Sequence, residues 1–297
     1  MNSNDNSLYV LLQQAGYAQI DNSEYVVHEL LQELSLFTLS KTDFFSNVAF
    51  NGGTALRIFH NLDRFSEDLD FSLIDKNVNC DLTYYGNKIK SGLEAFGIKA
   101  QIEEKKDKLT TGIEVAYLKF NKREIYDLCF KDNDKTNKLH RDELIKIKIE
   151  VDTKPADYAS FENLYKFKPL PYEVCLYDKP TLFAGKIHAV LCRSWGERFK
   201  GRDLYDYWYY IANKTELNLP YLSEKLRNSG HIGQDDECSI EDIKDMLCER
   251  FKQINYENAK KDVASFLTNN YPLDIWSPNF FIAMTQEIEG MEPSLGR

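Results

Sequence analysis

Val48-Ala-Phe-Asn-Gly-Gly-Thr-Ala-Leu-Arg-Ile-Phe-His60, followed by Arg64-Phe-Ser-Glu-Asp-Leu-Asp-Phe-Ser-Leu73, is the stretch that decides the fold. Residues 48–50 are apolar and partly β-branched, which is typical of a buried strand. Gly52 and Gly53 interrupt the strand, and residues 54–60 then follow a helical pattern. A helix that begins after glycines presents unpaired backbone N–H groups in its first turn, so the stretch predicts a phosphate-binding turn.

The second half of the stretch places two carboxylates on one side of a strand. Apolar residues at positions 69, 71 and 73 alternate with Asp68, Asp70 and Ser72, so the two sets face opposite sides of the strand. Two carboxylates in this spacing can bind one divalent cation together. Oxygen ligands completed by substrate phosphates suit Mg²⁺, so Asp68 and Asp70 are predicted to be metal ligands.

Each half of the stretch also has a simpler explanation. A lone Asp-x-Asp is usually a solvated strand face or a turn, and a lone Gly-Gly-Thr is usually a turn and helix cap. In this order, however, the two motifs resemble the nucleotidyltransferase superfamily. Gly-Gly-Thr-Ala-Leu followed by Arg-x-Ser-x-Asp-Leu-Asp-Phe resembles, more narrowly, the AbiEii/AbiGii (MenT-like) toxin family.

Composition limits the class of protein. The chain has 297 residues and a net charge of −10, which argues against general coating of nucleic acid but leaves room for a local basic patch. The six cysteines are scattered without a Cys-x-x-Cys pair, as expected for free thiols. Without a targeting signal or a run of about 18 apolar residues, the chain is expected to be cytoplasmic.

The remaining pattern predicts an α+β protein. We expect a nucleotidyltransferase-fold mixed β-sheet core with N-terminal helices in residues 1–175 and a C-terminal helical domain in residues 176–297, with Pro169 and Pro171 marking the boundary. The expected elements are helices within 1–47 and over 82–96, strands over 99–103, 113–120 and 144–152, a loop over 131–141, and helices over 181–193, 203–211, 235–249, 256–267 and 282–288.

Residues 144–152 form the clearest alternating strand of the chain. Lys146 and Lys148 are expected to be solvated on its polar side. Glu150 follows on the same side, between two apolar residues, where the superfamily often carries its third carboxylate. Whether Glu150 faces the metal site stays open.

A lysine and two late aspartates form a second group of candidates. Lys186 has apolar helical neighbours, so its ammonium must reach water or an anion: it either extends to solvent or binds nucleotide phosphate. Asp203 and Asp206 share one helix face. The order of these residues resembles the later motifs of the toxin family, a helical Lys and an Arg-Asp-x-x-Asp helix. The resemblance therefore implies that Lys186 binds nucleotide phosphate and that either Asp203 or Asp206 is the functional acid of the later motif.

The resemblance further implies the reaction. A hydroxyl would attack the α-phosphorus of an NTP and release pyrophosphate, with Mg²⁺ held by the two early aspartates and with Glu150 as a ligand of a second metal or an acceptor of the attacking proton. Arg64 would bind phosphate or fix the turn before the strand. The residues expected to cradle the phosphates are Gly52, Gly53 and Thr54, aided by Ser66.

The family also implies partners. Its members are toxins with a separately encoded antitoxin, and those that resemble this chain modify the acceptor end of tRNA. A basic cluster could bind that RNA or could be a solvated turn; it consists of Arg193, Arg198, Lys200 and Arg202. Two other functions remain open: a small-molecule nucleotidyltransferase of the antibiotic-modifying kind, and a non-catalytic nucleotide-binding module.

Overall fold

The structure is a computed structural model, and it describes residues 7–14, 23–105, 112–130, 136–137, 139–193, 200–268 and 271–291. The chain forms two compact units that interleave along the sequence. The first comprises Met1–Ala55, Phe65–Pro155 and Asn163–Leu176, and the second comprises Leu56–Arg64, Ala156–Glu162 and Tyr177–Arg297. The predicted division at residues 175 and 176 falls within a strand and stays a prediction.

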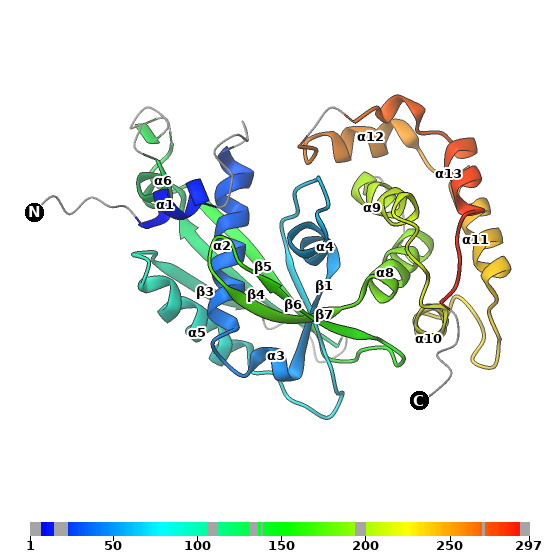
Figure 1. The fold of residues 1–297 in the computed structure, drawn as a ribbon, viewed down its shortest axis with the longest axis horizontal. Helices are drawn as coiled ribbons and strands as arrows, with labels where there is room; N and C mark the ends of the chain where they lie inside the picture. Colours follow the sequence, from blue (N-terminus) through cyan, green and yellow to red (C-terminus); the bar gives the residue numbers. More distant parts are fainter. Residues whose placement is uncertain are drawn as a thin grey trace, which may run out of the picture. The chain divides into compact units, whose positions relative to one another are not determined.

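Strands of the described residues form one mixed sheet in the order β3-β4-β5-β2-β1-β7-β6 (Figure 1). The strands are β1 (Val48–Asn51), β2 (Leu69–Leu73), β3 (Ala100–Lys105), β4 (Ile113–Asn121), β5 (Leu144–Asp152), β6 (Phe161–Lys166) and β7 (Tyr172–Tyr177). β2 is antiparallel to β1 and parallel to β5, while β1 is parallel to β7. The carboxylate-bearing strand β2 therefore lies between two partners in the middle of the sheet.

Alternation in β2 and β5 explains their burial. The apolar residues predicted to share one face of each strand are buried, whereas Leu144 at the start of β5 is exposed. Phe71 packs with its ring centroid 5.0 Å from that of Phe44 and 5.2 Å from that of Phe50. Ser72, expected on the polar side with Asp70, is also buried, at 2% exposure. The polar side of β2 is thus open only towards its beginning, where the aspartates lie.

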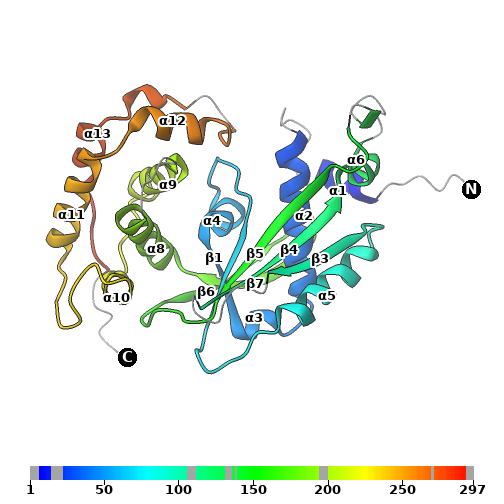
Figure 2. The same cartoon turned by 180° about the vertical axis from the view of Figure 1, so that it is seen from behind.

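Helices cover the sheet of the first unit. They are α1 (Ser7–Gln14), α2 (Ser23–Leu39), α3 (Phe44–Asn47), α5 (Leu82–Glu94) and α6 (Lys122–Cys129). α2 and α5 pack on one another and contact strands β3 to β5, and both views show them side by side (Figure 2). α6, β6 and β7 are not among the expected elements, because they are short and, in β6, lack an apolar alternation.

Helices also make up most of the second unit. They are α8 (Lys179–Cys192), α9 (Gly201–Ala212), α10 (Leu219–Asn228), α11 (Ile240–Lys252), α12 (Tyr256–Ala264) and α13 (Pro278–Thr285), with the 3₁₀ helix η2 (Leu273–Ile275). Tyr207 of α9 packs against Phe251 and Phe281 in their shared core.

The predicted class, a mixed sheet with N-terminal and C-terminal helices, is confirmed. The loop expected over residues 131–141 lies largely outside the described residues. In the described ranges, no helix combines the length and the apolar character needed to cross a membrane.

Candidate active site

A glycine turn joins β1 to helix α4 (Gly52–His60), as the sequence predicts. Gly52 has a φ of +74°, the left-handed region that side chains with a Cβ rarely adopt. A Cβ at Gly52 would also collide with the carboxylate of Asp70. Glycine is therefore required here twice, once for the backbone and once for the close approach of Asp70.

The pairing of β1 with β2 holds Asp70 close to Gly52. Asn51, the last residue of β1, is the register partner of Asp70 in β2. The Thr54 hydroxyl in the first turn of α4 donates a hydrogen bond to the carbonyl oxygen of Asp68. Thr54 is fully buried, so its side chain ties the helix to the aspartate segment, and its phosphate-binding role stays a prediction. The predicted turn and the predicted carboxylates thus lie in one place.

Helix α2 also holds the aspartate segment. The side-chain amide of Gln32 donates to the carbonyl oxygen of Ser66 at 3.2 Å, and Gln32 is 1% exposed. His28, one turn earlier, places its Nε2 3.3 Å from the carbonyl oxygen of Lys146. Burial lowers the pKa of His28, which favours the neutral ring. Polar residues within the apolar stripe of α2 were the sequence signal for this role, and the phosphate-binding role of Ser66 stays a prediction.

Glu150 is the register partner of Asp70 across the parallel pair of β2 and β5. Its carboxylate binds the ammonium of Lys148 at 2.7 Å. Within the described part of the chain, no three His, Cys, Asp or Glu side chains converge as a metal site. Glu150 therefore lies beside the aspartates without completing a three-acid cluster.

The donor set of Asp68 and Asp70 fits Mg²⁺. The carboxylate of Asp70 lies where a Cβ at Gly52 would be, and Asp68 is held two residues earlier through its backbone carbonyl, so the two residues offer oxygen ligands close to the glycine turn. Mg²⁺ is commonly held by one or two carboxylates plus substrate phosphates and water rather than by a closed protein site. The two aspartates would hold the ion, with the nucleotide completing its ligands.

Within the second unit, Arg64 pairs with Asp206 of α9. Its Nε and Nη2 donate to the two carboxylate oxygens at 2.6 Å each. Arg64 is 3% exposed and Asp206 is fully buried. Such a bidentate pair fixes the geometry of both groups. The two roles predicted for Arg64, binding phosphate and fixing the turn before the strand, both stay predictions.

Lys186 of α8 contacts both late aspartates. Its Nζ lies 2.7 Å from Asp203 Oδ1 and 2.8 Å from Asp206 Oδ2, and Arg193 also pairs with Asp203. Burial alone would raise the pKa of Asp203, but Lys186 and Arg193 hold it at about 2. The anion that makes the apolar surroundings of Lys186 tolerable is thus supplied by the protein. Both aspartates belong to this cluster, and the phosphate-binding role of Lys186 stays a prediction.

Only part of the basic cluster before α9 is described, since Arg198 lies outside the described residues. The Arg202 guanidinium lies 4.1 Å from the ring centroid of Phe266 and 4.0 Å from Asp262. Lys200 is exposed. Arg193 and Arg202 therefore have contacts within the protein, and RNA binding by this cluster stays a prediction.

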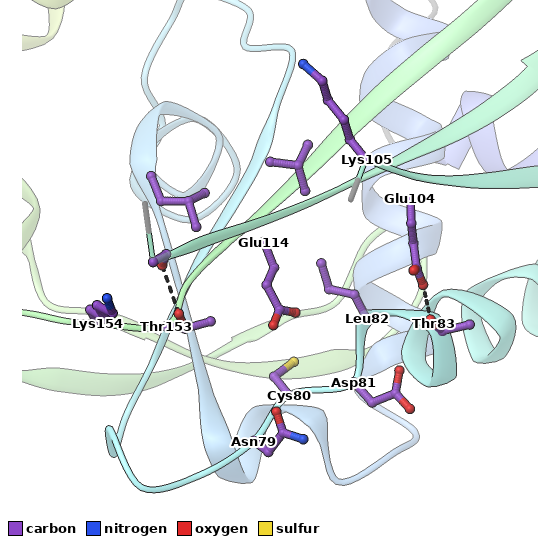
Figure 3. A pocket seen from close by; sticks show the side chains of 13 residues that line it. Asn79, Cys80, Asp81, Leu82, Thr83, Glu104, Lys105, Glu114, Thr153 and Lys154 are labelled. Atoms are coloured by element: carbon purple, nitrogen blue, oxygen red, sulfur yellow. Dashed lines mark hydrogen bonds between the residues drawn. The ribbon is translucent and has the colours of Figure 1, made fainter. Parts of the chain in front are cut away.

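A surface pocket of about 670 Å³ lies elsewhere in the first unit, at the start of α5 and the ends of β3 and β4 (Figure 3). Figure 3 shows Glu114 pointing towards Cys80. Burial, together with Asp81 and Glu104, raises the pKa of Glu114. None of the candidate site residues lines this pocket, so size alone does not identify the site.

A glycine turn that closely approaches the carboxylate of a strand aspartate, on a mixed sheet, is the arrangement that the sequence predicts for a nucleotidyltransferase. The chain belongs to the family described as nucleotidyl transferase AbiEii toxin, type IV toxin–antitoxin system, whose family model matches residues 34–283. The family resemblance predicted from the sequence is confirmed.

Two crystal structures from Helicobacter pylori also match the chain, one of JHP933 and one of a protein described provisionally as a nucleotidyltransferase. Each is 18% identical over 89% of this chain, with a TM-score of 0.49, and the matches cover 91% and 94% of those chains. No curated protein matches the chain.

Proposed function

We propose that this enzyme transfers a nucleotide from an NTP to an RNA acceptor such as the 3′ end of tRNA, in a Mg²⁺-dependent reaction, and that it is the toxin of a pair with a separately encoded antitoxin. The observation that carries the proposal is the contact between the Gly52 turn and the Asp70 carboxylate. It supports the proposal because it brings a turn that could bind phosphate close to Asp70, one of the two proposed metal ligands.

The reaction follows from this arrangement. Backbone N–H groups at the start of α4 would bind phosphate oxygens of the NTP, and Asp68 and Asp70 would hold the cation. A hydroxyl oxygen of the acceptor forms a bond to the α-phosphorus, the bond to the bridging oxygen breaks, pyrophosphate leaves and the hydroxyl proton is released. When bound, Mg²⁺ supplies positive charge that neutralises the phosphates.

The RNA acceptor rests on membership of a toxin family and on the exposed basic residue Lys200 near the start of α9. A small-molecule acceptor would make the same use of the turn and the aspartates. The acceptor must therefore be identified by where the nucleotide goes.

The test is incubation of the purified protein with one α-³²P-labelled NTP at a time, with Mg²⁺, total RNA and total protein. Label in RNA, lost with EDTA, is the expected result. In Asp70→Asn, transfer should fall about 100-fold or more, because removal of a preorganised electrostatic group typically costs that much. Asp75→Asn, an exposed aspartate just beyond β2, is the matched control. Label in a small molecule would exclude the RNA acceptor, and no transfer from any NTP would exclude the proposed activity.

A further inference from the structure

The charged side of β5 continues the site beyond the two aspartates. β2 and β5 are parallel, with Leu69 opposite Ile149 and Asp70 opposite Glu150. Asp68 directly precedes the first paired residue of β2, and its charge acts on Lys148, which directly precedes Ile149. Paired residues of neighbouring strands point to the same face of a sheet, about 5 Å apart. Lys148 and Glu150 therefore lie on the face that carries the aspartates.

Lys148 is bound within this group of acids. Its ammonium lies 2.7 Å from Glu150 Oε1, and the side chains of both residues are about one third exposed, at 31% and 28%. Burial alone would lower the pKa of Lys148, whereas the hydrogen bond to Glu150 and the charges of Glu150 and Asp68 raise it overall. The lysine is thus kept charged beside the predicted metal ligands, instead of being simply solvated as expected from the sequence.

The carboxylate of Glu150 is in turn bound by the ammonium of Lys148. A carboxylate bound to an ammonium on its own strand is oriented along that strand, and the described residues contain no three-acid metal group that would include it. An ammonium has three N–H donors, so Lys148 can keep its bond to Glu150 and still bind an anion in front of the aspartates.

We propose that Lys148 binds a phosphate group of the nucleotide and that Glu150 is its positioning residue instead of a third metal ligand. The assignment rests on the proposed function, because it needs a metal-bound nucleotide at Asp68 and Asp70. The polyphosphate of an NTP is the anion that such a site would place beside Asp68, and a lysine is a common partner of phosphate.

Lys146 is the matched control. It is on the same strand and the same face, two residues further from Asp70, and is exposed. Two residues along a strand correspond to about 7 Å, which takes Lys146 away from a phosphate bound at the aspartates. Replacing Lys146 or Lys148 by Gln changes the net charge equally, so a difference in nucleotide binding between the two variants depends on where the lysine lies.

The experiment measures binding of the α,β-methylene analogues of the four NTPs, one at a time with Mg²⁺, by calorimetry on the full chain. Lys148→Gln should weaken binding by about tenfold or more, as for loss of a charge-assisted hydrogen bond, and Lys148→Arg should restore most of it. Lys146→Gln should stay within about twofold, because it leaves every close phosphate contact in place. Equal effects of Lys148→Gln and Lys146→Gln would overturn the assignment.

Glu150 is tested by metal binding without nucleotide. Mn²⁺ affinity, measured by electron paramagnetic resonance, should stay within about threefold in Glu150→Gln, because a positioning residue does not ligate the metal. A loss of about tenfold or more is the behaviour of a ligand or its direct support and would overturn the positioning role.

A double variant tests whether Lys148 and Glu150 act together in nucleotide binding. The Lys148→Gln, Glu150→Gln double variant should bind nucleotide no more weakly than Lys148→Gln alone, since Glu150 acts through the lysine. Additive losses would contradict this. Wild-type protein that binds no nucleotide would overturn the proposed function as well, whereas wild-type binding with an unaffected Lys148→Gln variant would overturn only the present inference.

Discussion

Gly52 is the single residue on which the geometry of the site depends most directly. The matched comparison is Gly97, whose φ of +76° is almost the same but where an added Cβ would meet no neighbouring atom within 4 Å. Gly97→Ala should cost about 1 kcal/mol of unfolding free energy from backbone strain alone. Gly52→Ala carries the same strain and in addition displaces Asp70.

We therefore expect Gly52→Ala to be less stable than Gly97→Ala and to lose nucleotide transfer, while Gly97→Ala keeps it. Urea unfolding and the labelled-NTP assay measure the two effects. Equal stability and equal activity of the two variants would show that the contact between Gly52 and Asp70 is unimportant.

Asp203 makes stability depend on pH. Its folded pKa is held at about 2, below the ordinary aspartate value of 3.8. A carboxylate with a lowered folded pKa stabilises the protein above its unfolded pKa, and this contribution disappears as pH falls through the folded value. About 2 kcal/mol should therefore be lost between about pH 4 and pH 2.

The measurement is urea unfolding of wild type and Asp203→Asn at several pH values in this range. The variant starts less stable because Lys186 and Arg193 lose their partner. Its stability should nevertheless fall less steeply with acid. Parallel curves for the two proteins would contradict the assigned pKa.

At the scale of elements, α8 and α9 are joined by the cluster of Lys186 with Asp203 and Asp206. Removing one partner of a buried ion pair typically costs about 3–5 kcal/mol, because it leaves an uncompensated charge. The side chain of Lys186 is 14% exposed, and Arg64 and Arg193 would still pair with the two aspartates in its absence. We therefore expect Lys186→Met to lower the free energy of unfolding by about 3 kcal/mol, the lower end of this range. If Lys186 served only to bind a nucleotide phosphate, Lys186→Met would instead leave the free energy of unfolding of the nucleotide-free protein unchanged or raise it.

Lys179→Met provides the control for this element. Lys179 is exposed at the start of α8, so its substitution should stay within about 0.5 kcal/mol of wild type. Chemical denaturation compares the two variants, and NTP binding is measured alongside. If Lys186→Met were as stable as Lys179→Met and bound NTP weakly, nucleotide binding rather than the aspartate cluster would explain the lysine.

The segment that follows α4 also belongs to this group of elements. Tyr205 of α9 donates to Asp63 at 2.5 Å, and Tyr209 donates to the carbonyl oxygen of His60. Together with the pair of Arg64 and Asp206, these bonds hold the connection between α4 and β2. α9 therefore fixes the chain segment that leads from the end of α4 towards the aspartate strand.

At the scale of the whole molecule, the interleaved units predict that the chain cannot be divided simply. A fragment of residues 178–297 lacks Arg64, which leaves the buried Asp206 without its bidentate partner. We expect this fragment not to unfold cooperatively in urea by itself. Co-expression with residues 1–177 should restore a cooperative transition, and Arg64→Met in that partner should weaken the restoration.

Circular dichroism measures each transition. A 178–297 fragment that unfolds alone with the midpoint of the intact chain would show that the segment over residues 56–64 is dispensable. It would also support the simple division at residues 175 and 176 expected from the sequence.

The strands and the glycine turn could be predicted because each depends on local pattern. β5 spans the predicted residues 144–152, and β2 differs from its prediction only by Asp68. The positions of Asp68, Asp70 and Gly52 in one site followed from a strand, a turn and a strand that are close in the chain. By contrast, β6 and β7 were missed, since both span only six residues and the half-exposed β6 lacks an apolar alternation.

Partners of the charged residues were decided only by tertiary structure. The sequence shows that Lys186 needs an anion, but Asp206 and Arg64 are 142 positions apart, and no local pattern indicates that they pair. Lys148, expected to be solvated, pairs with Glu150 on its own strand, and the alignment of β5 with β2 places this pair beside Asp70.

The sequence by itself determined the family and the glycine turn that approaches the aspartate strand, because backbone geometry and strand alternation act over a few residues. The tertiary structure decided which charges neutralise one another, because Coulomb interactions and burial depend on distance in space rather than along the chain.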